Sequence, residues 1–509
     1  MRFSLFPLRP SRDELSRASV ASRCRSHAIV VGASIGGLCA AEVLARHFDL
    51  VTVVERDALS DDPDALRRGV PQGAHPHGIL SRGRKELEAL FPGLMRSLLD
   101  KGAFDFDGSY DMARYTPEGW APRHRNTGAH AFACSRPLLE LTIRKLLVAQ
   151  RPNLRFLENT RFIEPLYERR GQDVWVTGVR TDAKDESQRE LSADFVVDAT
   201  GRGTKSWKWV SEVGLARPRE RRVDAKVNYA TRHYRAPAEA RDWWWKCLLI
   251  DNHPPHFKRA GAILNVENDR WLVTASGVNG DYAPTDEAGW LAFMKGLRSP
   301  LVYEMLQRAE PISDIIQNRT TVNVWKEAHH WDAPLHGLLL YGDAICTFNP
   351  AYGQGMTAAA LGAQLLDAEL TNAPGPLDQR FLSGFYKKQA KFLEEGWAYS
   401  TTLDLRWPET EGTRPFYYGA LCELSYLIER VAIHDAGMLR KLVPLVDFGV
   451  KRYAVFTPDF LARGAVGLAR RFLARPTLPG PRDIDLLAPA DHVRNEGSGE
   501  HTLPSSDAA

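Results

Sequence analysis

The segment from His27 to Glu55, HAIVVGASIGGLCAAEVLARHFDLVTVVE, constrains the fold more than any other part of the chain. Residues 28–31 form an apolar, partly β-branched run that is typical of a buried parallel strand. Glycines 32, 36 and 37 follow, then an Ala- and Leu-rich stretch with helical spacing over 38–46, and a second apolar run over 50–54. Strand, glycine turn, helix, strand and acid in this order predict the first βαβ unit of a dinucleotide-binding fold.

Each residue type in this unit has a physical role. Gly32 allows the tight turn out of the strand, and Gly37 lets the helix pack closely on it. The free N–H groups at the helix start favour a pyrophosphate. Glu55 lies where an acid accepts hydrogen bonds from an adenosine ribose, whereas Ser34 replaces the middle glycine of the fingerprint. A doubly wound domain without a ligand is the alternative for this unit taken alone.

A Gly- and Pro-rich loop, RRGVPQGAHPHGIL, occupies residues 67–80. Long irregular segments inside compact domains are usually functional or disordered, and the helix-like pattern over 79–90 favours an ordered one. We therefore expect this loop to lie against a bound cofactor. The alternative is a turn in which the rings of His75 and His77 bond the local backbone.

Two further segments carry polar groups at predicted helix and strand ends. A helix is expected to start at Ser135-Arg136-Pro137, with Ser135 as its N-cap. Arg136 opposes the helix dipole there, so an anion beside it would resolve the conflict, and a solvated arginine is the alternative. Strands are expected at 154–157, 174–179 and 195–197, and the last runs into the glycine turn DATGRG at 198–203.

The segment GLLLYGDAICTFNPAYGQGMTAAAL at 337–361 returns to the same pattern. A buried strand over 338–341 ends at Gly342-Asp343, and a turn over 349–355 leads into a helix of small residues. Asp343 can accept hydrogen bonds from a polyol, and the helix that opens at Gly355 favours a group carrying negative charge. No common structural need produces Gly-Asp, Asn-Pro and Gly-Gln-Gly in this order, so the pattern indicates a ligand.

Residues 206–331 have a different character. Period-2 alternation over 223–233 predicts a strand with Val223, Val227 and Tyr229 on one face. Residues 262–266 and 271–275 predict a hairpin around Asn268-Asp269, and 320–326 another strand. We expect a half-exposed antiparallel sheet that covers a pocket. Trp243, Trp244 and Trp245 are expected in its core, with the lining of a substrate cavity as the alternative.

The carboxyl-terminal part is predicted to be helical and aromatic over 377–475. Apolar and basic residues mix over 439–473, which favours packing on the cofactor domain, with weak peripheral contact to a membrane surface as the alternative. From about residue 476 the chain is rich in Pro, Asp and Ser and is predicted to be disordered.

Composition excludes several classes of protein. The 509 residues suffice for two or three domains, and the net charge of +3 is too small to indicate a nucleic-acid partner. Six cysteines without paired spacing indicate a reducing, cytoplasmic compartment and neither a zinc site nor a disulfide framework. The sequence contains no run of about 18 apolar residues, so a transmembrane helix is not expected. The basic stretch 1–26 is expected to be a flexible leader, with an organellar transit peptide as the alternative.

Taken together, the motifs resemble those of the FAD-dependent monooxygenases with the p-hydroxybenzoate hydroxylase fold. They are most similar to the bacterial secondary-metabolism branch that includes the flavin epoxidases and the squalene epoxidase group. The resemblance covers about residues 27–395. It is carried by VVGASIGGL with Glu55, RGVPQGAHPHGIL, SRPLLE, VVDATGRG and GDAICTFNPAYGQGM.

The resemblance implies an FAD site without a metal. Gly32, Ser34 and Gly37 would hold the pyrophosphate, Glu55 the adenosine ribose and Asp343 the ribityl chain, while Arg136 would reach the pyrophosphate or ribityl region. By family position, His75 and His77 are the nearest candidates for a catalytic general base. The residues that would flank the isoalloxazine are Pro350, Gly353, Gly355 and Met356, and the rest of the implied set is Gly36, Arg56 and Gly342.

The implied reaction is oxygen transfer from a flavin hydroperoxide, formed with O₂, to an apolar aromatic or alkene substrate, by hydroxylation or epoxidation. Thr200-Gly201 stands where relatives that take hydride directly from NADPH tend to carry Asp-Gly. Reduction by NAD(P)H can therefore be direct or pass through a partner flavin or electron-transfer reductase. A flavin halogenase, an isoprenoid reductase and a flavin-free protein that binds prenylated partners are the alternatives. The Trp-x-Trp-x-Ile-Pro signature of halogenases is not found around Trp243–Trp245.

The expected fold class is α/β: a Rossmann-like FAD-binding domain with an inserted antiparallel substrate domain and a C-terminal helical region. The FAD-binding domain would comprise 27–85, 131–205 and 332–395. The substrate domain would comprise an excursion at 86–130 and the insertion at 206–331. The leader 1–26, the helical region 396–475 and the tail 476–509 complete the layout.

Overall fold

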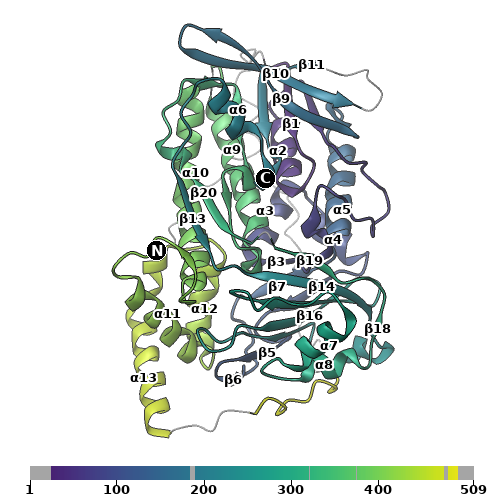
Figure 1. The fold of residues 1–509 in the computed structure, drawn as a ribbon, viewed down its shortest axis with the longest axis vertical. Coiled ribbons are helices and arrows are strands. Elements are labelled where there is room, and N and C mark those ends of the chain that lie inside the picture. Colours follow the sequence, from purple (N-terminus) through teal and green to yellow (C-terminus); the bar gives the residue numbers. More distant parts are fainter. Residues whose placement is uncertain (1–24, 184–189, 320, 374, 475–479, 491–509) are drawn as a thin grey trace, which may run out of the picture.

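A five-stranded parallel sheet lies at the centre of the upper half of the molecule in Figure 1. The computed structural model describes residues 25–183, 190–319, 321–373, 375–474 and 480–490, and every structural statement below concerns these residues. The strand order is β22-β12-β1-β2-β8. Almost every residue of β1 and β2 is buried, as parallel strands covered on both faces require. The bounds are β1 (His27–Val31), β2 (Leu50–Val54), β8 (Leu154–Leu157), β12 (Phe195–Asp198) and β22 (Leu338–Leu340).

The register of this sheet aligns the carboxyl ends of its strands. Val31 lies opposite Val54 on one side and opposite Asp198 on the other, and Asp198 lies opposite Leu340. The segments that follow β1, β2, β12 and β22 therefore leave the sheet at one edge, where open α/β sheets bind ligands. The α/β fold class predicted from the sequence is confirmed.

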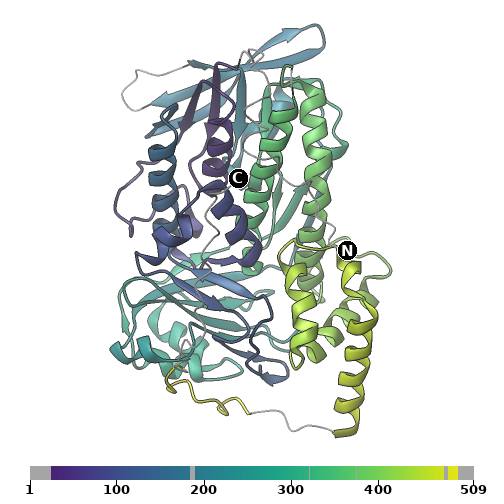
Figure 2. The ribbon, with the colours of Figure 1, turned by 180° about the vertical axis from the view of Figure 1, so that it is seen from behind.

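Helices cover the parallel sheet, and the longest of them run alongside it in Figures 1 and 2. Helix α2, predicted over 38–46, spans Ile35–Leu44, and it contacts both α5 and α9. Helix α5 begins after Ser135, whose hydroxyl accepts a hydrogen bond from the Leu138 N–H, so the predicted N-cap is confirmed. The remaining helices of this half are α3 (Ser81–Leu90), α4 (Leu94–Leu99), α5 (Arg136–Gln150), α6 (Ser206–Glu212), α9 (Gly355–Asn372) and α10 (Gln379–Asp404).

An eight-stranded sheet forms the lower half of the molecule in Figure 1, next to α7 (Glu287–Lys295) and α8 (Leu301–Leu306). The predicted hairpin is confirmed: Asn268 and Asp269 connect two of its strands, with φ values of 61° and 52°. The strands are β5 (Met112–Thr116), β6 (Gly119–Trp120), β14 (Asn228–Arg235), β15 (Cys247–Ile250), β16 (Ala260–Val266), β17 (Arg270–Gly277), β18 (Glu310–Pro311) and β19 (Ile316–Asn318).

The single strand predicted over 223–233 is wrong. The chain forms β13 (Glu220–Asp224) and β14 in two different sheets. Between them Lys226 has a φ of 49°, a left-handed conformation that interrupts the alternation of faces. Val223 and Tyr229 therefore belong to separate sheets, although the sequence alternates with period 2 across both strands.

Three further small sheets complete the fold, and the one that contains β9, β10 and β11 lies at the top of Figure 1, at the opposite end from the eight-stranded sheet. The strand predicted over 320–326 is confirmed as β20 over its last four residues, 323–326. The strands of these sheets are β3 (Gly78–Leu80), β4 (Phe104–Asp107) and β7 (His130–Ala133); β9 (Thr160–Arg170), β10 (Asp173–Ala183), β11 (Glu190–Ser192) and β21 (Leu335–His336); and β13, β20 (Asn323–Lys326), β23 (Cys346–Thr347) and β24 (Glu411–Gly412).

The tryptophan triplet packs in the core of the eight-stranded sheet, as expected. The Trp245 ring lies 5.7 Å from the Trp271 ring, and the indole N–H groups of Trp244 and Trp245 donate to the carbonyl oxygens of Asp485 and Leu486. Leu486 is buried in the same cluster. The prediction of a disordered tail is therefore wrong for residues 480–490, because two buried indoles need acceptors that this segment supplies. The rest of the tail and most of the predicted leader lie outside the described residues.

Three helices pack beside the lower sheet in Figure 1: α11 (Tyr418–Ala432), α12 (Ala436–Val446) and α13 (Pro458–Ala474). Membrane contact through this part of the chain stays a prediction. Among the described helices, none has the combination of length and apolar character needed to cross a bilayer. The exposed large apolar residues on these three helices and their connections include Phe416, Tyr417, Tyr453, Leu461, Val466, Phe472 and Leu473.

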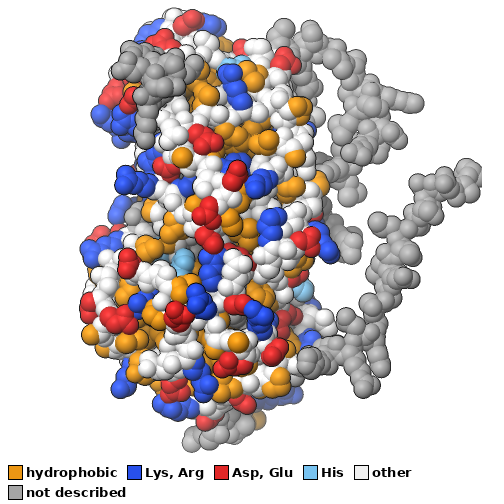
Figure 3. Space-filling model, turned by 90° about the vertical axis from the view of Figure 1, so that its right-hand side faces the viewer, with side chains coloured by type: hydrophobic (Ala, Val, Ile, Leu, Met, Phe, Trp, Pro, Cys, Tyr) orange, Lys and Arg blue, Asp and Glu red, His pale blue; other side chains and the backbone are white. Residues whose placement is uncertain are grey.

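Charged side chains of both signs are interspersed among apolar ones on the face shown in Figure 3. Many of these charges form local pairs of opposite sign, which agrees with a net charge of only +3. Examples are Arg180 with Glu164 and Arg235 with Glu310, both of which are solvent-exposed. Pairs of this kind contribute little to stability.

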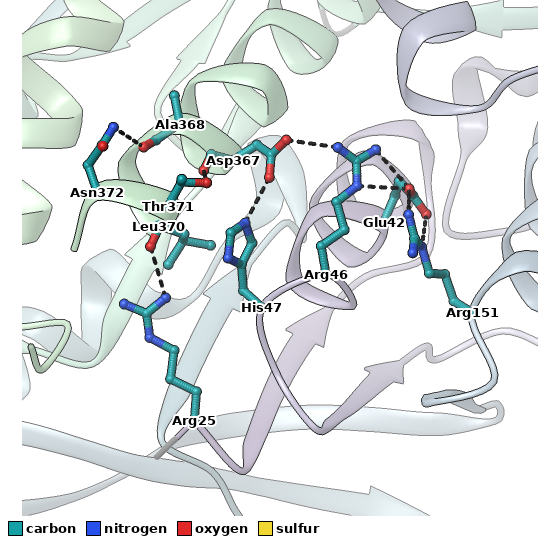
Figure 4. A network of polar contacts seen from close by, with 10 residues as sticks. All are labelled: Arg25, Glu42, Arg46, His47, Arg151, Asp367, Ala368, Leu370, Thr371 and Asn372. Carbon is teal, nitrogen blue, oxygen red and sulfur yellow. Dashed lines mark hydrogen bonds and ion pairs between the residues drawn. The ribbon is translucent and has the colours of Figure 1, made fainter. Parts of the chain in front are cut away.

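An ion-pair network around the buried Glu42 fastens α2 to its two neighbouring helices (Figure 4). Glu42 on α2 has a side chain only 1% exposed, and its Oε1 lies 2.8 Å from Arg46 Nη2 and 2.7 Å from Arg151 Nη2. Arg46 and His47 also reach the carboxylate of Asp367 on α9, at 2.8 and 2.7 Å. These ion pairs at the carboxyl-terminal end of α2 fix the position of the helix, and with it the glycine loop at its start.

Glu42→Ala should destabilise the protein by roughly 2 kcal/mol, because it removes the charge-assisted hydrogen bonds of Glu42 to the partly exposed Arg46 and Arg151. Glu212→Ala is the matched control, since Glu212 pairs with Lys208 in solvent and should change stability by less than about 1 kcal/mol. Urea unfolding followed by tryptophan fluorescence measures both. Equal effects for the two variants would contradict the importance of the network.

Candidate functional site

A cavity of about 1650 Å³ opens at the carboxyl edge of the parallel sheet and continues between the eight-stranded sheet and the carboxyl-terminal helices. Segments that the sequence singled out lie far apart along the chain, but they meet on the wall of this cavity. The predicted site residues on this wall are Gly32, Ser34, Gly36, Glu55, Arg56, His75, His77, Arg136, Gly342, Asp343, Pro350, Gly353, Gly355 and Met356.

Glycines shape the first turn of the wall. Gly32 has a φ of 99°, and a β-carbon there would lie 2.8 Å from the Ala199 carbonyl oxygen. Gly37, predicted as a pyrophosphate ligand, packs against the first strand, since its β-carbon would lie 1.8 Å from the Gly32 carbonyl oxygen. The close packing expected at Gly37 is confirmed, and its role in holding a pyrophosphate stays a prediction.

Glu55 holds the glycine turn in place. Its carboxylate accepts hydrogen bonds from the N–H groups of Ala33 at 2.8 Å and Asp57 at 3.0 Å. Arg67 Nη1 lies 3.2 Å from Glu55 Oε2, and Glu55 is 6% exposed. The acid at the end of β2 thus fixes the turn after β1 while it faces the cavity.

Arg136 is buried and hydrogen-bonded to other side chains, so the alternative of a solvated arginine is wrong. Its Nε donates to Glu140 Oε1 at 2.8 Å, and an Nη2 hydrogen bond of 2.9 Å reaches the Ser34 hydroxyl, which itself donates to Glu140. Burial favours the neutral form of Glu140, but Arg136 and Arg67 outweigh burial and lower the pKa of this carboxyl. Glu140 thus keeps a negative charge between two arginines. The hydroxyl of Ser34, the departure from the glycine fingerprint, joins this cluster to the start of α2.

Glu140 and Arg67 are members of the site that the sequence argument did not assign. The only available signal was the spacing of Glu140, which lies four residues after Arg136 on a predicted helix. Arg67 comes from the irregular loop, and its distance from Glu140 could not be obtained from the sequence.

Asp343 faces the cavity from the turn η5 (Gly342–Ala344), beside the start of α9. Within the described residues, no group donates a hydrogen bond to its carboxylate, and a β-carbon on Gly355 would lie 3.9 Å from its Oδ1. Burial raises the pKa of Asp343, although Arg202 and Arg136 act in the opposite direction. A carboxylate that faces a cavity without a protein donor can accept hydrogen bonds from a bound hydroxyl group.

The turn over 349–353 is fastened from behind by Asp404, at the end of α10. The Asp404 carboxylate accepts hydrogen bonds from Asn349 Nδ2 at 2.9 Å, from the Tyr352 hydroxyl at 2.7 Å and from Asn323 Nδ2 at 2.5 Å. Asn323 Oδ1 also accepts from the Asn349 N–H at 2.8 Å. Asp404 is 1% exposed and was not predicted, because its partners lie 52 to 81 residues away in sequence.

The two histidines of the loop differ in their surroundings. His75 Nδ1 pairs with the Thr231 hydroxyl at 2.8 Å, and its Nε2, buried at the cavity wall, has no partner within the described residues. His77 Nδ1 pairs with the His75 carbonyl oxygen, as the alternative interpretation of the loop expects for this residue. Burial lowers the pKa of His75 to about 4 and that of His77 to about 3. Both rings are neutral and weakly basic near pH 7, and a catalytic role for either stays a prediction.

Several solved structures with this architecture are described as flavin-dependent proteins or flavoproteins. The flavin-dependent brominase Bmp2 aligns with a TM-score of 0.58 and 13% identity, covering 88% of this chain and 100% of the brominase. PqsL of Pseudomonas aeruginosa, described as a probable FAD-dependent monooxygenase, aligns with a TM-score of 0.51 and 16% identity over 75% of this chain and 98% of PqsL. A flavoprotein/dehydrogenase from Cytophaga hutchinsonii gives 0.59 and 14%, covering 88% and 99% of the two chains. The fold is thus that of the flavin-dependent monooxygenases and related flavoproteins.

A sequence relative identifies the family. Protein Rv3254 of Mycobacterium tuberculosis (strain ATCC 25618 / H37Rv) is 33% identical over 348 residues, which cover 67% of this chain and 72% of the relative. The chain belongs to the family of Protein Rv3254. No protein-family model matches the sequence.

Asp404→Asn should make the protein's stability less dependent on pH. Burial raises the pKa of Asp404 from 3.8 to about 6, so the folded protein binds this proton more tightly than the unfolded chain. The stability gained from protonation is fully present below about pH 4 and is lost as the pH rises through 6. The difference between wild type and Asp404→Asn should therefore change by roughly 3 kcal/mol between pH 4 and 7, with the wild type losing stability.

Urea unfolding across this pH range measures that difference. Asp314→Asn is the control, because Asp314 is exposed and should leave the pH profile unchanged. A wild-type profile that runs parallel to the Asp404→Asn profile would contradict the buried state of this carboxyl.

Proposed function

We propose that the protein is an FAD-dependent monooxygenase that hydroxylates or epoxidises an apolar organic substrate. The observation that carries this proposal is the convergence of the glycine turn, Glu55, Asp343 and the start of α9 on one cavity, which then extends into an apolar chamber. The fold shared with flavoproteins supports the same reading.

The residues on the wall fit an FAD molecule. Gly32 leaves room for close approach, and the N–H groups at the start of α2 would receive the pyrophosphate. The unpartnered carboxylate of Asp343 would accept hydrogen bonds from ribityl hydroxyls. Met356 and the turn containing Pro350 and Gly353 would flank the ring system, and the dipole of α9 would favour negative charge there. When bound, the flavin supplies the activation of O₂, and the protein supplies position and electrostatics.

The far part of the cavity suits an apolar substrate. Its wall includes Met112 and Leu249 from the eight-stranded sheet and Ile428, Leu442 and Val443 from the carboxyl-terminal helices. An apolar enclosure would exclude water from the reacting centre, which protects reactive intermediates from side reactions.

Reduction by NAD(P)H, direct or through a partner reductase, is part of the proposal. Thr200, which stands where direct NADPH users tend to carry Asp, is bonded through its N–H and hydroxyl to Asp198. Steady-state oxidation of NADPH by the purified flavoprotein without a second protein would favour the direct route.

A flavin halogenase is the second candidate, because a brominase shares the fold over 88% of this chain. Trp243–Trp245 lies in the protein core and takes no part in the cavity wall, so it gives no support to that candidate. Incubation of the reduced protein with host extract, bromide and ¹⁸O₂ separates the two activities by mass. A product heavier by one ¹⁸O atom supports oxygenation, and a brominated product supports halogenation.

Asp343→Ala should raise the Kd for FAD roughly 10- to 100-fold, because a charged acceptor of ribityl hydrogen bonds is lost. Fluorescence quenching of free FAD on titration with apoprotein measures this Kd. Asp314→Ala, a change at an exposed carboxylate, is the control and should bind FAD like the wild type.

Two outcomes would contradict this assignment. Unchanged FAD affinity in Asp343→Ala would remove Asp343 from the site. Wild-type protein that stays colourless after incubation with FAD would overturn the flavoprotein proposal and favour the flavin-free alternative.

A further inference from the structure

A polar cluster interrupts the apolar wall of the cavity at the place where the eight-stranded sheet meets the carboxyl-terminal helices. Arg114 projects from β5, Asp251 follows the last residue of the neighbouring strand β15, and Tyr399 comes from α10. All three line the cavity. No motif in the sequence marks them, because they come from three distant segments.

The cluster lies next to the proposed position of the flavin ring. The Tyr399 ring is 6.1 Å from the Tyr352 ring, measured between centroids. Tyr352 belongs to the turn η6 (Pro350–Tyr352), which would flank the isoalloxazine. A molecule that contacts Tyr399 is therefore close to the reacting end of the cavity.

Several hydrogen-bonding atoms of the cluster are not used by the protein. Arg114 Nε donates to Asp251 Oδ2 at 2.9 Å. Within the described part of the chain, Arg114 Nη1 and Nη2, Asp251 Oδ1 and the Tyr399 hydroxyl have no hydrogen-bond partner. The cavity thus offers four N–H donors, one carboxylate acceptor and one hydroxyl that can act in either way.

The charges of the cluster are balanced. Arg114 pairs with Asp251, and the adjacent Arg406 donates from both Nη atoms to the two oxygens of Glu429, each at 2.8 Å. Glu429 and Arg406 also line the cavity. Arg298 also acts on Asp251 but does not line the cavity. Because Arg114 and Arg406, which do line it, each have an anion, the cluster favours a neutral polar group over a carboxylate or an ammonium group.

We propose that Arg114, Asp251 and Tyr399 form a recognition subsite for a neutral oxygenated ring that carries a carbonyl group and a hydroxyl group in meta positions, too far apart to hydrogen-bond to each other. The carbonyl oxygen accepts from Arg114 Nη and Tyr399, and the hydroxyl donates to Asp251 Oδ1. This inference rests on the proposed function and narrows its substrate class. The Arg114 side chain is 48% exposed, so water can reach its donors in the free protein. A hydrocarbon alkene would displace that water without replacing its hydrogen bonds, which is unfavourable.

Equilibrium dialysis of the FAD-loaded protein with matched naphthalene probes tests the subsite. The probes are the hydroxyketone 1-(4-hydroxynaphthalen-2-yl)ethanone, the hydrocarbon 2-ethylnaphthalene and the acid 4-hydroxy-2-naphthoate. For wild type we expect the hydroxyketone to bind at least tenfold more tightly than the hydrocarbon. Arg114→Gln should weaken the hydroxyketone about tenfold and Tyr399→Phe about threefold, with the hydrocarbon changed less than twofold in both.

Arg96→Gln is the control, because Arg96 is 80% exposed on α4 and should bind all three probes like the wild type. Loss of all three probes to the same extent in both Arg114→Gln and Tyr399→Phe would overturn the subsite. So would equal or undetectable binding of the hydroxyketone and the hydrocarbon by wild type. Tighter binding of the acid than of the hydroxyketone would overturn the assignment to neutral substrates.

The FAD content of each sample, read from its visible absorbance, separates this inference from the proposed function. Protein that takes up no FAD but still selects the hydroxyketone through Arg114 would support the subsite and overturn the monooxygenase. Protein that binds FAD tightly but does not distinguish the probes would keep the monooxygenase and overturn the subsite.

Discussion

The parallel register of β1, β2, β12 and β22 is the constraint on which the site depends. Val31, Val54, Asp198 and Leu340 end their strands side by side, so the chain must reverse or turn four times at one edge. Hydrogen bonding between the strands fixes this alignment, since a shift of one strand would move its turn along the sheet. The glycines relieve the crowding that results, as at Gly32, where the Ala199 carbonyl oxygen leaves no space for a side chain.

Buried carboxylates then hold these crowded turns in position. Glu55 binds backbone N–H groups of the first turn, and Glu140 joins Ser34 to two arginines. Asp198 is fully buried and accepts hydrogen bonds from Thr200 and Ser206 in the turn after β12, while Asp404 fastens the turn over 349–353. Each carboxylate is surrounded by donors, which offset part of the desolvation of its charge. At Asp404 burial still outweighs them and raises the pKa to about 6. The wall of the cavity is therefore rigid at the points where a ligand would meet backbone.

The sequence predicted the parts of the fold and site that depend on local chemistry. The strand ends, the glycine turns and the helix starting at Gly355 follow from residue types and spacing within some 30 residues. Glu140 could be suspected only from its helical spacing to Arg136, and Asp404, Arg114 and Asp251 gave no signal, because their partners are set by tertiary packing. The strand predicted over 223–233 was wrong for a related reason. Its alternation is genuine, but a single left-handed residue, Lys226, sends the two halves into different sheets.

The segment 480–490 has a consequence for how the molecule can be dissected. It lies beyond α13 in the sequence, yet its carbonyl groups satisfy the indoles of Trp244 and Trp245 within the lower sheet. Removal of the residues after 474 would leave the indole N–H groups of Trp244 and Trp245 without their acceptors. It would also remove the buried side chain of Leu486 from the core. Limited proteolysis would show the same relation from the other side: a cut before residue 480 would leave the released peptide bound to the sheet.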